Sequence, residues 1–384
     1  QGGAWSAIGG MFGRAFDPAR RVVALGDDIF VAGTINQAFD TAGHALGARN
    51  IVRWSGGWHL VSSPGIDSYG PGPTSAMAGR GTCGPFVAGD YDLVGETWIN
   101  GVGRLGPDGQ LSALTTASRL TPPPRQLAVG PDGTLYAAGQ TWIETSSRRI
   151  EAPVARLRGD TWEPIGMPFI ANVAGIVVDE GGTVYVGGNF ENPEDPALSH
   201  LLRARGDTWA PVGTREPRPV TALALIDGAL VIAEDLGDGT SQIARYRDGA
   251  WETVGTSLPA YVRVVFGDPG GLLIAGANIT ASSSVARLTG TSWEPVGRMP
   301  ADAFVAALQR VGDTLVAVGR FALTAGGPGV NAAYLDTDTF RPLGGGLDAA
   351  VGSLFQTSRG LLLVGEFESA GGIASSGVAR FEPR

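Results

Sequence analysis

The chain has 384 residues, with 37 acidic and 28 basic side chains and a formal charge of −9 at pH 7. All 28 basic residues are arginine, which excludes Schiff-base chemistry on a lysine and a phosphate-binding loop lysine. An acidic chain without a basic cluster argues against nucleic acid as a partner. The sequence has a single cysteine, so no intrachain disulfide forms, and no apolar run approaches the ~20 residues of a membrane helix.

The first predicted element is a short strand at residues 4–9 that introduces a recurring motif. The motif is an aromatic residue, a short apolar strand and, in most copies, a glycine. Its copies lie at 5–9, 58–61, 162–166, 209–213, 251–255, 293–297 and 340–344. Leu111 occupies the same place without an aromatic side chain. Eight units of about 48 residues therefore account for the whole chain.

Three further strands are expected in each unit, before the aromatic strand. The first is an apolar run, as at 22–25, 127–129, 222–225 and 262–266. The second ends in small residues, as at 30–33, 136–139, 185–188, 316–319 and 363–365. The third ends in Arg, as at 51–53, 154–156, 243–245, 285–287 and 378–380. Gly and Asp between the first two strands suit tight hairpin turns.

Four antiparallel strands repeated eight times predict an all-β protein with one domain over residues 1–384, a single eight-bladed β-propeller. A solenoid is the competing architecture, and it would need capping repeats at both ends. Here the chain ends after a third strand and begins with an isolated fourth strand. We therefore expect residues 1–9 to complete the last blade and to close the ring.

Several strings resemble kelch-like propeller repeats of bacterial secreted and surface proteins, and the related repeats of fungal cortical polarity markers. They are Val186-Gly-Gly-Asn-Phe190, Gly365-Glu-Phe-Glu-Ser-Ala-Gly-Gly372 and Ile243-Ala-Arg-Tyr246 before an aromatic strand. The resemblance covers essentially the whole chain. It implies the propeller fold and an extracytoplasmic location, whether secreted, periplasmic or surface-attached. It supplies no shared catalytic residue.

Residues that recur in every unit are expected to serve the fold. Seven third strands carry an arginine, with Tyr334 in the remaining one: Arg53, Arg104, Arg156, Arg203, Arg245, Arg287 and Arg380. We expect these guanidinium groups to stack on aromatic rings or to bond a neighbouring blade. The periodic tryptophans are expected in the core.

No catalytic, cofactor or metal motif is found. The segment 101–106 matches G-x-G-x-x-G, but it lies on a predicted third strand and lacks the helix that a dinucleotide site needs. Of the three histidines, His44 and His200 lie in loops three units apart and His59 lies on a fourth strand at the rim, so no shared metal site is expected. Acidic clusters with oxygen ligands leave Ca²⁺ as a weakly supported partner.

Long loops indicate the working face. The loop between strands two and three and the connection from strand four to the next blade emerge on one face. From the end of strand two to the strand-three Arg is 20 residues in blade one and 17 in blade three, against 11 in blade six. Excess loop length in a compact repeat is usually functional or mobile. The pair Thr97-Trp-Ile99 and Thr141-Trp-Ile143 recurs here. The predicted partner-binding residues are Tyr69, Asp90, Asp92, Trp98, Trp142, Glu144, Arg148 and Arg149.

These features favour a non-catalytic binding or scaffold protein whose partner is a protein or a glycan, held by blades one to three. A glycan-binding lectin is the first alternative, although the loops differ from blade to blade. An enzyme, such as a lyase or hydrolase with acids and Arg at the central funnel, is the second. Alternatively, Trp98 and Trp142 only pin their loops to the blades.

Overall fold

The computed structural model of the protein describes residues 3–7, 11–13, 19–25, 28–33, 35–39, 45–46, 51–54, 58–60, 66–67, 74–80, 83–89, 93–94, 97–98, 101–105, 111–115, 117–166, 171–300, 302–324, 329–357, 360–365, 367–374 and 378–383. Over these residues the chain is all-β. The one helical element among them is the short 3-10 turn η1 (Pro196–Leu198).

Eight four-stranded antiparallel sheets form the body of the described part. Sheet 1 contains β3 (Ala19–Leu25), β4 (Asp28–Gly33), β7 (Ile51–Trp54) and β8 (Trp58–Leu60). Sheet 2 contains β10 (Thr74–Arg80), β11 (Cys83–Gly89), β14 (Val102–Leu105) and β15 (Leu111–Ala113). Sheet 3 contains β17 (Gln126–Val129), β18 (Leu135–Ala138), β21 (Val154–Arg158) and β22 (Thr161–Pro164). Sheet 4 contains β23 (Ala171–Val178), β24 (Val184–Phe190), β25 (Leu201–Arg205) and β26 (Thr208–Pro211).

The remaining four sheets follow the same strand order. Sheet 5 contains β27 (Val220–Ile226), β28 (Ala229–Asp235), β29 (Ser241–Arg247) and β30 (Ala250–Leu258). Sheet 6 contains β31 (Tyr261–Asp268), β32 (Gly271–Ala277), β33 (Val285–Thr289) and β34 (Ser292–Pro295). Sheet 7 contains β35 (Phe304–Val311), β36 (Thr314–Arg320), β37 (Ala332–Asp336) and β38 (Thr339–Pro342). Sheet 8 contains β39 (Val351–Thr357), β40 (Gly360–Gly365), β43 (Val378–Pro383) and β1 (Gly3–Ala7).

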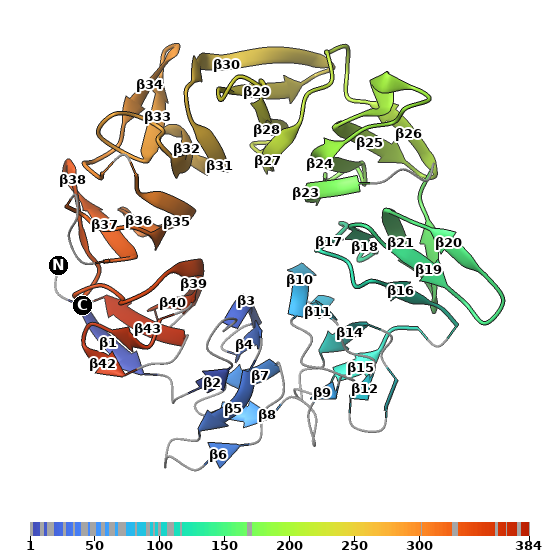
Figure 1. Cartoon of the computed structure of the whole chain (residues 1–384), viewed down its shortest axis with the longest axis horizontal. Helices are drawn as coiled ribbons and strands as arrows, with labels where there is room; N and C mark the ends of the chain where they lie inside the picture. Colours follow the sequence, from blue (N-terminus) through green and yellow to red (C-terminus); the bar gives the residue numbers. More distant parts are fainter. Residues whose placement is uncertain are drawn as a thin grey trace.

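The sheets stand around a common centre, with the first strand of each sheet innermost (Figure 1). Each first strand contacts the first strand of the next sheet, and β39 of sheet 8 contacts β3 of sheet 1. The apolar core lies between neighbouring sheets: one buried cluster joins sheets 5 and 6, and another joins sheets 6 and 7. The fold is therefore propeller-like, as the repeats predict.

The N-terminal strand lies beside the C-terminal one. β1 pairs with β43 in an antiparallel register that places Trp5 opposite Phe381. β1 is therefore the fourth strand of sheet 8, and the two chain ends meet at its edge (Figure 1). This is the pairing that the repeat phase predicts for residues 4–9.

A bulge near the start of the first strand explains the small residues that end strand two. In sheet 6 the register shifts between Val262 and Val264, opposite Gly276. A β-carbon on Gly276 would overlap the carbonyl oxygen of Tyr261, and one on Gly319 of sheet 7 would overlap that of Phe304. In these sheets the strand-two glycine is favoured because the bulge brings the first-strand backbone too close for a β-carbon.

The recurring aromatic residue and glycine form the joint between neighbouring sheets. Gly255 of sheet 5 has φ +71°, and Trp293 of sheet 6 packs on it while its Nε1 donates to the Thr256 carbonyl at 2.9 Å. The same contact joins Gly166 to Trp209, Gly213 to Trp251 and Gly297 to Phe340. The indole N–H groups of Trp209 and Trp251 donate to the carbonyls of Ile165 and Val212. Trp162, Trp209 and Trp293 are buried, as their periodicity predicts.

Arg156 of sheet 3 behaves as expected for the third-strand arginines. Its NH1 donates to the Gly206 carbonyl of sheet 4 at 3.3 Å, and its NH2 pairs with Asp207 of that sheet. Arg104 lies over the Phe86 ring, with Cζ 6.0 Å from its centroid. Arg245 instead pairs with Glu252 of its own sheet at 2.8 Å.

Small accessory sheets decorate four sheets that are neighbours around the ring. On sheet 1 the accessory strands are β2 (Met11–Gly13), β5 (Ile35–Phe39) and β6 (Ala45–Leu46). On sheet 2 they are β9 (Ile66–Asp67), β12 (Leu93–Val94) and β13 (Thr97–Trp98). On sheet 3 they are β16 (Arg119–Thr121), β19 (Trp142–Glu144) and β20 (Arg149–Glu151). On sheet 8 they are β41 (Ser369–Ala370) and β42 (Ile373–Ala374), with a bridge from Leu347 to Ala370.

Each of these accessory sheets joins two connections. In sheet 3, β16 precedes the first strand and pairs with β19, which follows the second strand. The loop from strand two to strand three and the incoming connection from the preceding sheet therefore share one face, as the order of the strands predicts.

Candidate partner-binding site

The accessory sheet of sheet 3 holds the part of the predicted site whose side chains are described. Its cross-strand rows are Arg119 with Glu144 and Arg149, Leu120 with Ile143 and Ile150, and Thr121 with Trp142 and Glu151. In the middle row Leu120 and Ile143 are each 2% exposed and join the core. Because side chains alternate between the faces of a strand, the other two rows face away from the core.

Four side chains of the outer rows contact one another, and we call them the Trp142 patch: Arg119, Trp142, Glu144 and Arg149. Glu144 binds both arginines, with Arg119 NH2 at 2.7 Å from Oε2 and Arg149 Nε at 3.1 Å from Oε1. The Cζ atom of Arg149 lies 4.4 Å from the Trp142 ring centroid. The patch therefore combines a cation–π contact with two ion pairs.

The patch is ordered yet open to solvent. The side chains of Arg119 and Arg149 are 46% and 54% exposed, and Trp142 is half-buried. Exposed ion pairs add little stability, typically ~0.2–1 kcal/mol. Glu144 bridges the two guanidinium groups, and Arg149 in turn covers the Trp142 ring. A fixed aromatic ring beside Arg is typical of interface hot spots.

The structure brings together three of the predicted residues, Trp142, Glu144 and Arg149. Arg148 is exposed on the adjoining turn, where its backbone N–H donates to Thr145 Oγ1 at 3.1 Å. Tyr69, Asp90 and Asp92 lie outside the described residues, and Trp98 is placed in β13 at the level of the backbone.

The two Thr-Trp-Ile strings do not occupy equivalent positions. Trp98 lies in the second strand of its accessory hairpin and pairs with Leu93. Trp142 lies in the first strand of its hairpin and pairs with Thr121 and Glu151. The recurrence in sequence is therefore not a repeat in structure.

Arg119 was not among the predicted site residues, because no aromatic side chain or long insertion singles it out in the sequence. Arg119 belongs to the incoming connection, and it reaches Glu144 from the far side of the accessory sheet. The signal was present in the sequence. A charged residue followed by a buried Leu120 in the connection indicates an additional strand.

A buried glutamate replaces the strand-two glycine in sheet 5. Glu234 lies opposite the bulge, is 2% exposed, and receives a hydrogen bond from Arg215 Nε at 2.9 Å. Burial raises the pKa of Glu234, and Arg215 opposes this shift. Arg215 also lies 5.3 Å from the ring centroid of Trp251. The pair therefore fixes the connection between sheets 4 and 5 rather than facing solvent.

His200 is buried at the start of the third strand of sheet 4. It has φ 62°, its Nδ1 has no hydrogen-bond partner, and burial lowers its pKa. His44 lies outside the described residues, and the side chain of His59 in β8 is not described. In the ranges given above, no three His, Cys, Asp or Glu side chains gather closely enough to hold a metal ion.

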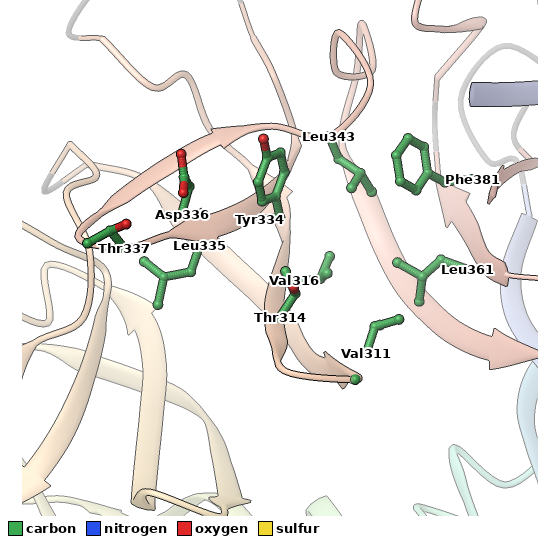
Figure 2. Close-up of a pocket in the computed structure, with 11 residues that line it drawn as sticks. Val311, Thr314, Val316, Tyr334, Leu335, Asp336, Thr337, Leu343, Leu361 and Phe381 are labelled. Carbon is green, nitrogen blue, oxygen red and sulfur yellow. The ribbon is translucent and has the colours of Figure 1, made fainter. Parts of the chain in front are cut away.

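A cleft opens between sheets 7 and 8 at the end of the sheets opposite the accessory strands. It has a volume of about 440 Å³. Figure 2 shows Leu361 and Phe381 on one side and Tyr334, Val316 and Thr314 on the other. Tyr334 occupies the position that arginine holds in the other third strands, and it lines the cleft.

Comparisons with known proteins concern the fold. No family model matches the sequence, and no curated protein matches it. The computationally designed Ika8 protein is similar with a TM-score of 0.54 and 12% identity, over 98% of this chain and 99% of that chain. YCF48 bound to D1 peptide gives a TM-score of 0.46 and 12% identity, over 83% and 100%. An extracellular domain from B. thetaiotaomicron gives 0.33 and 12%, over 91% and 52%. At this identity nothing about function follows from these likenesses.

Proposed function

We propose that the chain is one eight-bladed propeller, closed by its N-terminal strand, that serves as a non-catalytic binding or scaffold protein. The eight four-stranded sheets, the cycle of contacts between their first strands and the pairing of β1 with β43 support this architecture. The kelch-like resemblance of the repeats and their expected extracytoplasmic location belong to the same proposal. No helix in the described part of the chain is long and apolar enough to cross a membrane.

We place the partner on the accessory sheets of sheets 1 to 3, and we take the partner to be a protein. The observation that carries this placement is the Trp142 patch. Its indole and guanidinium groups already contact one another at the surface, which lowers the side-chain entropy that binding must remove. A protein surface that offers a carboxylate and an apolar contact would match them.

Substitution of Trp142 tests this placement. Trp142→Ala is expected to weaken partner binding about 30-fold, the effect of a hot-spot residue worth ~2 kcal/mol. The melting temperature should stay within a few degrees, since Trp142 is only half-buried. Binding is measured by titration calorimetry with the partner captured from the extracellular fraction of the source cells.

Arg341→Ala is the matched control. Arg341 is also exposed and ion-paired, to Asp336, but it lies in sheet 7 at the opposite end of the strands. This variant is expected to bind as the wild type does. A partner that loses affinity with Arg341→Ala but not with Trp142→Ala would place the interface on the opposite face.

A lectin function is the alternative that the Trp142 patch also allows, because an indole beside Arg can stack on a sugar ring. A glycan array separates the two functions. Saturable binding of a glycan that is lost with Trp142→Ala would replace the protein partner by a carbohydrate.

An enzyme would need its acids and bases in one place. Among the described residues, the groups with shifted pKa values are spread over sheets 3 to 6: Asp132, Tyr136, Tyr185, His200, Glu234, Asp238 and Asp268.

A further inference from the structure

A recess of about 350 Å³ lies in the innermost wall of the ring, away from the accessory sheets' Trp142 patch. It is lined by the first strands of four successive sheets, β17, β23, β27 and β31. These strands lie side by side at the centre of the ring (Figure 1). We call it the central recess and define it by the residues Gln126, Ala174, Gly175, Thr221, Leu223 and Arg263.

The recess opens where sheet 4 places two small residues, Ala174 and Gly175, beside the larger Ile176 and Val177. Ala174 is the bulge residue of β23, since the register shifts between Val173 and Gly175. The bulge residues of sheets 5 and 6 are larger, Thr221 and Arg263. Small side chains in sheet 4, flanked by larger ones, leave a hollow of the size that small-molecule sites have.

Three polar side chains line the recess, and one of them, Arg263, is charged. Arg263 is exposed, and no ion pair to it is found within the described residues. The Gln126 amide lies across from it, and its Nε2 donates to the Ala174 carbonyl at 3.3 Å. Thr221 Oγ1 lies between them and bonds the Val262 carbonyl at 2.8 Å. None of the recess-lining residues is acidic.

Arginine at this register position is not confined to sheet 6. The bulge of sheet 1 falls at Arg20, between Ala19 and Arg21. In sheet 3 the corresponding residue is Arg125, whose backbone N–H donates to Ala138 and whose side chain is exposed. A protein with a net charge of −9 thus has three arginines at one register position of its innermost strands. The joints described above are made by the recurring aromatic residue and glycine, and Arg125 and Arg263 are exposed.

We propose that the central recess binds a small organic anion, with Arg263 as the counter-charge for its carboxylate or phosphate group. The planar guanidinium presents paired N–H donors that match either group. Gln126 supplies an amide to a polar substituent, and Leu223 with the small residues of sheet 4 accepts an apolar body. This site is separate from the Trp142 patch, so it stands whether or not the partner proposed above is found.

Isothermal titration of the whole chain with citrate, inorganic phosphate and inorganic sulfate tests the proposal. We expect saturable binding of at least one of these anions in low-salt buffer. Arg263→Gln should weaken that binding about 10- to 100-fold, the usual worth of a hydrogen-bonded charge converted at 1.4 kcal/mol per tenfold. Citrate binding without phosphate binding would assign the site to carboxylates, and the reverse would assign it to phosphates.

Two further variants make the outcome decisive. Arg298→Gln removes the same charge from an exposed arginine in the connection after sheet 6, and it is expected to bind as the wild type does. Ala174→Phe fills the recess without changing the charge and is expected to abolish binding. Circular dichroism confirms that each variant is folded. The proposal is overturned if no anion binds up to about 10 mM, if both arginine variants lose affinity equally, or if Ala174→Phe still binds.

Discussion

Substitution of a joint glycine tests whether the recurring motif holds one sheet on the next. A β-carbon on Gly255 would lie 2.6 Å from Nε1 and 2.9 Å from Cε2 of Trp293, closer than packed atoms approach. Gly255 also has φ +71°. Gly290 is the matched control, because it has φ +61° and nothing lies within 4 Å of the position of its β-carbon.

The two variants share one cost and differ in the other. Gly290→Ala should cost only the left-handed backbone strain, ~1–2 kcal/mol. Gly255→Ala carries the same strain and must also displace a buried indole. Overpacking of ~1–3 kcal/mol and the loss of the Trp293 hydrogen bond, ~1 kcal/mol, add to it. We therefore expect Gly255→Ala to be less stable than Gly290→Ala by ~2–4 kcal/mol.

Urea unfolding, followed by circular dichroism at pH 7, measures the difference. A double-mutant cycle with Trp293→Ala isolates the contact, because the excess cost of Gly255→Ala should vanish when the indole is absent. Equal unfolding midpoints for Gly255→Ala and Gly290→Ala would refute the joint as we describe it.

Two predictions concern pH. The side chain of Asp268 is enclosed by Arg287 and Arg310, while the residue as a whole is half-buried; burial would raise the pKa of Asp268, but the Arg310 hydrogen bonds and charge outweigh this and lower it. Its stabilisation is therefore present above the unfolded pKa near ~3.9 and is lost as pH falls through the folded pKa. Asp268→Asn should cost ~3 kcal/mol at pH 7 and flatten the acid limb of a plot of urea midpoint against pH; an unchanged limb would contradict this. Burial lowers the pKa of His200, so the unfolded chain binds its proton first and stability falls as pH drops below ~6.5. His200→Asn, which copies Asn331 at the corresponding φ 59° position, should reduce that fall between pH ~7 and ~5, and an equal fall in both proteins would be evidence against it.

The strands of the body were predictable because each follows from a repeated pattern. The apolar run of β28 and the tryptophan near the start of β34 recur at the same phase in other units. A strand that is clear in one unit therefore predicts the equivalent strand in the others. The pairing of β1 with β43 followed from that phase alone. The reason for each repeated glycine was not predictable, because the bulge and the joint are contacts between segments far apart in the sequence.

The accessory strands were not predicted as strands. Elements such as β12 and β13 have two residues each, too short to show an alternation of apolar and polar side chains. Their shared face was predictable from the strand order, which places both connections at the same end of a sheet. Loop length then indicated which blades carry the longest connections. The Trp142 patch needed the structure, because Arg119 and Glu144 are 25 residues apart and meet only through the pairing of β16 with β19.

The bulge in each first strand has a consequence for how this molecule can vary. It leaves one residue of each shifted sheet without a cross-strand partner, at the same register position each time, and Arg125 precedes the first strand of sheet 3 at that position. Those positions are Arg20, Ser75, Arg125, Ala174, Thr221, Arg263, Ala306 and Gly352. The contacts opposite the bulge and at the aromatic joint are made by other residues, so we expect these eight positions to accept substitutions that leave the sheets in place. Substitutions at these positions would change the chemistry along the innermost strands and leave the packing of the sheets unchanged.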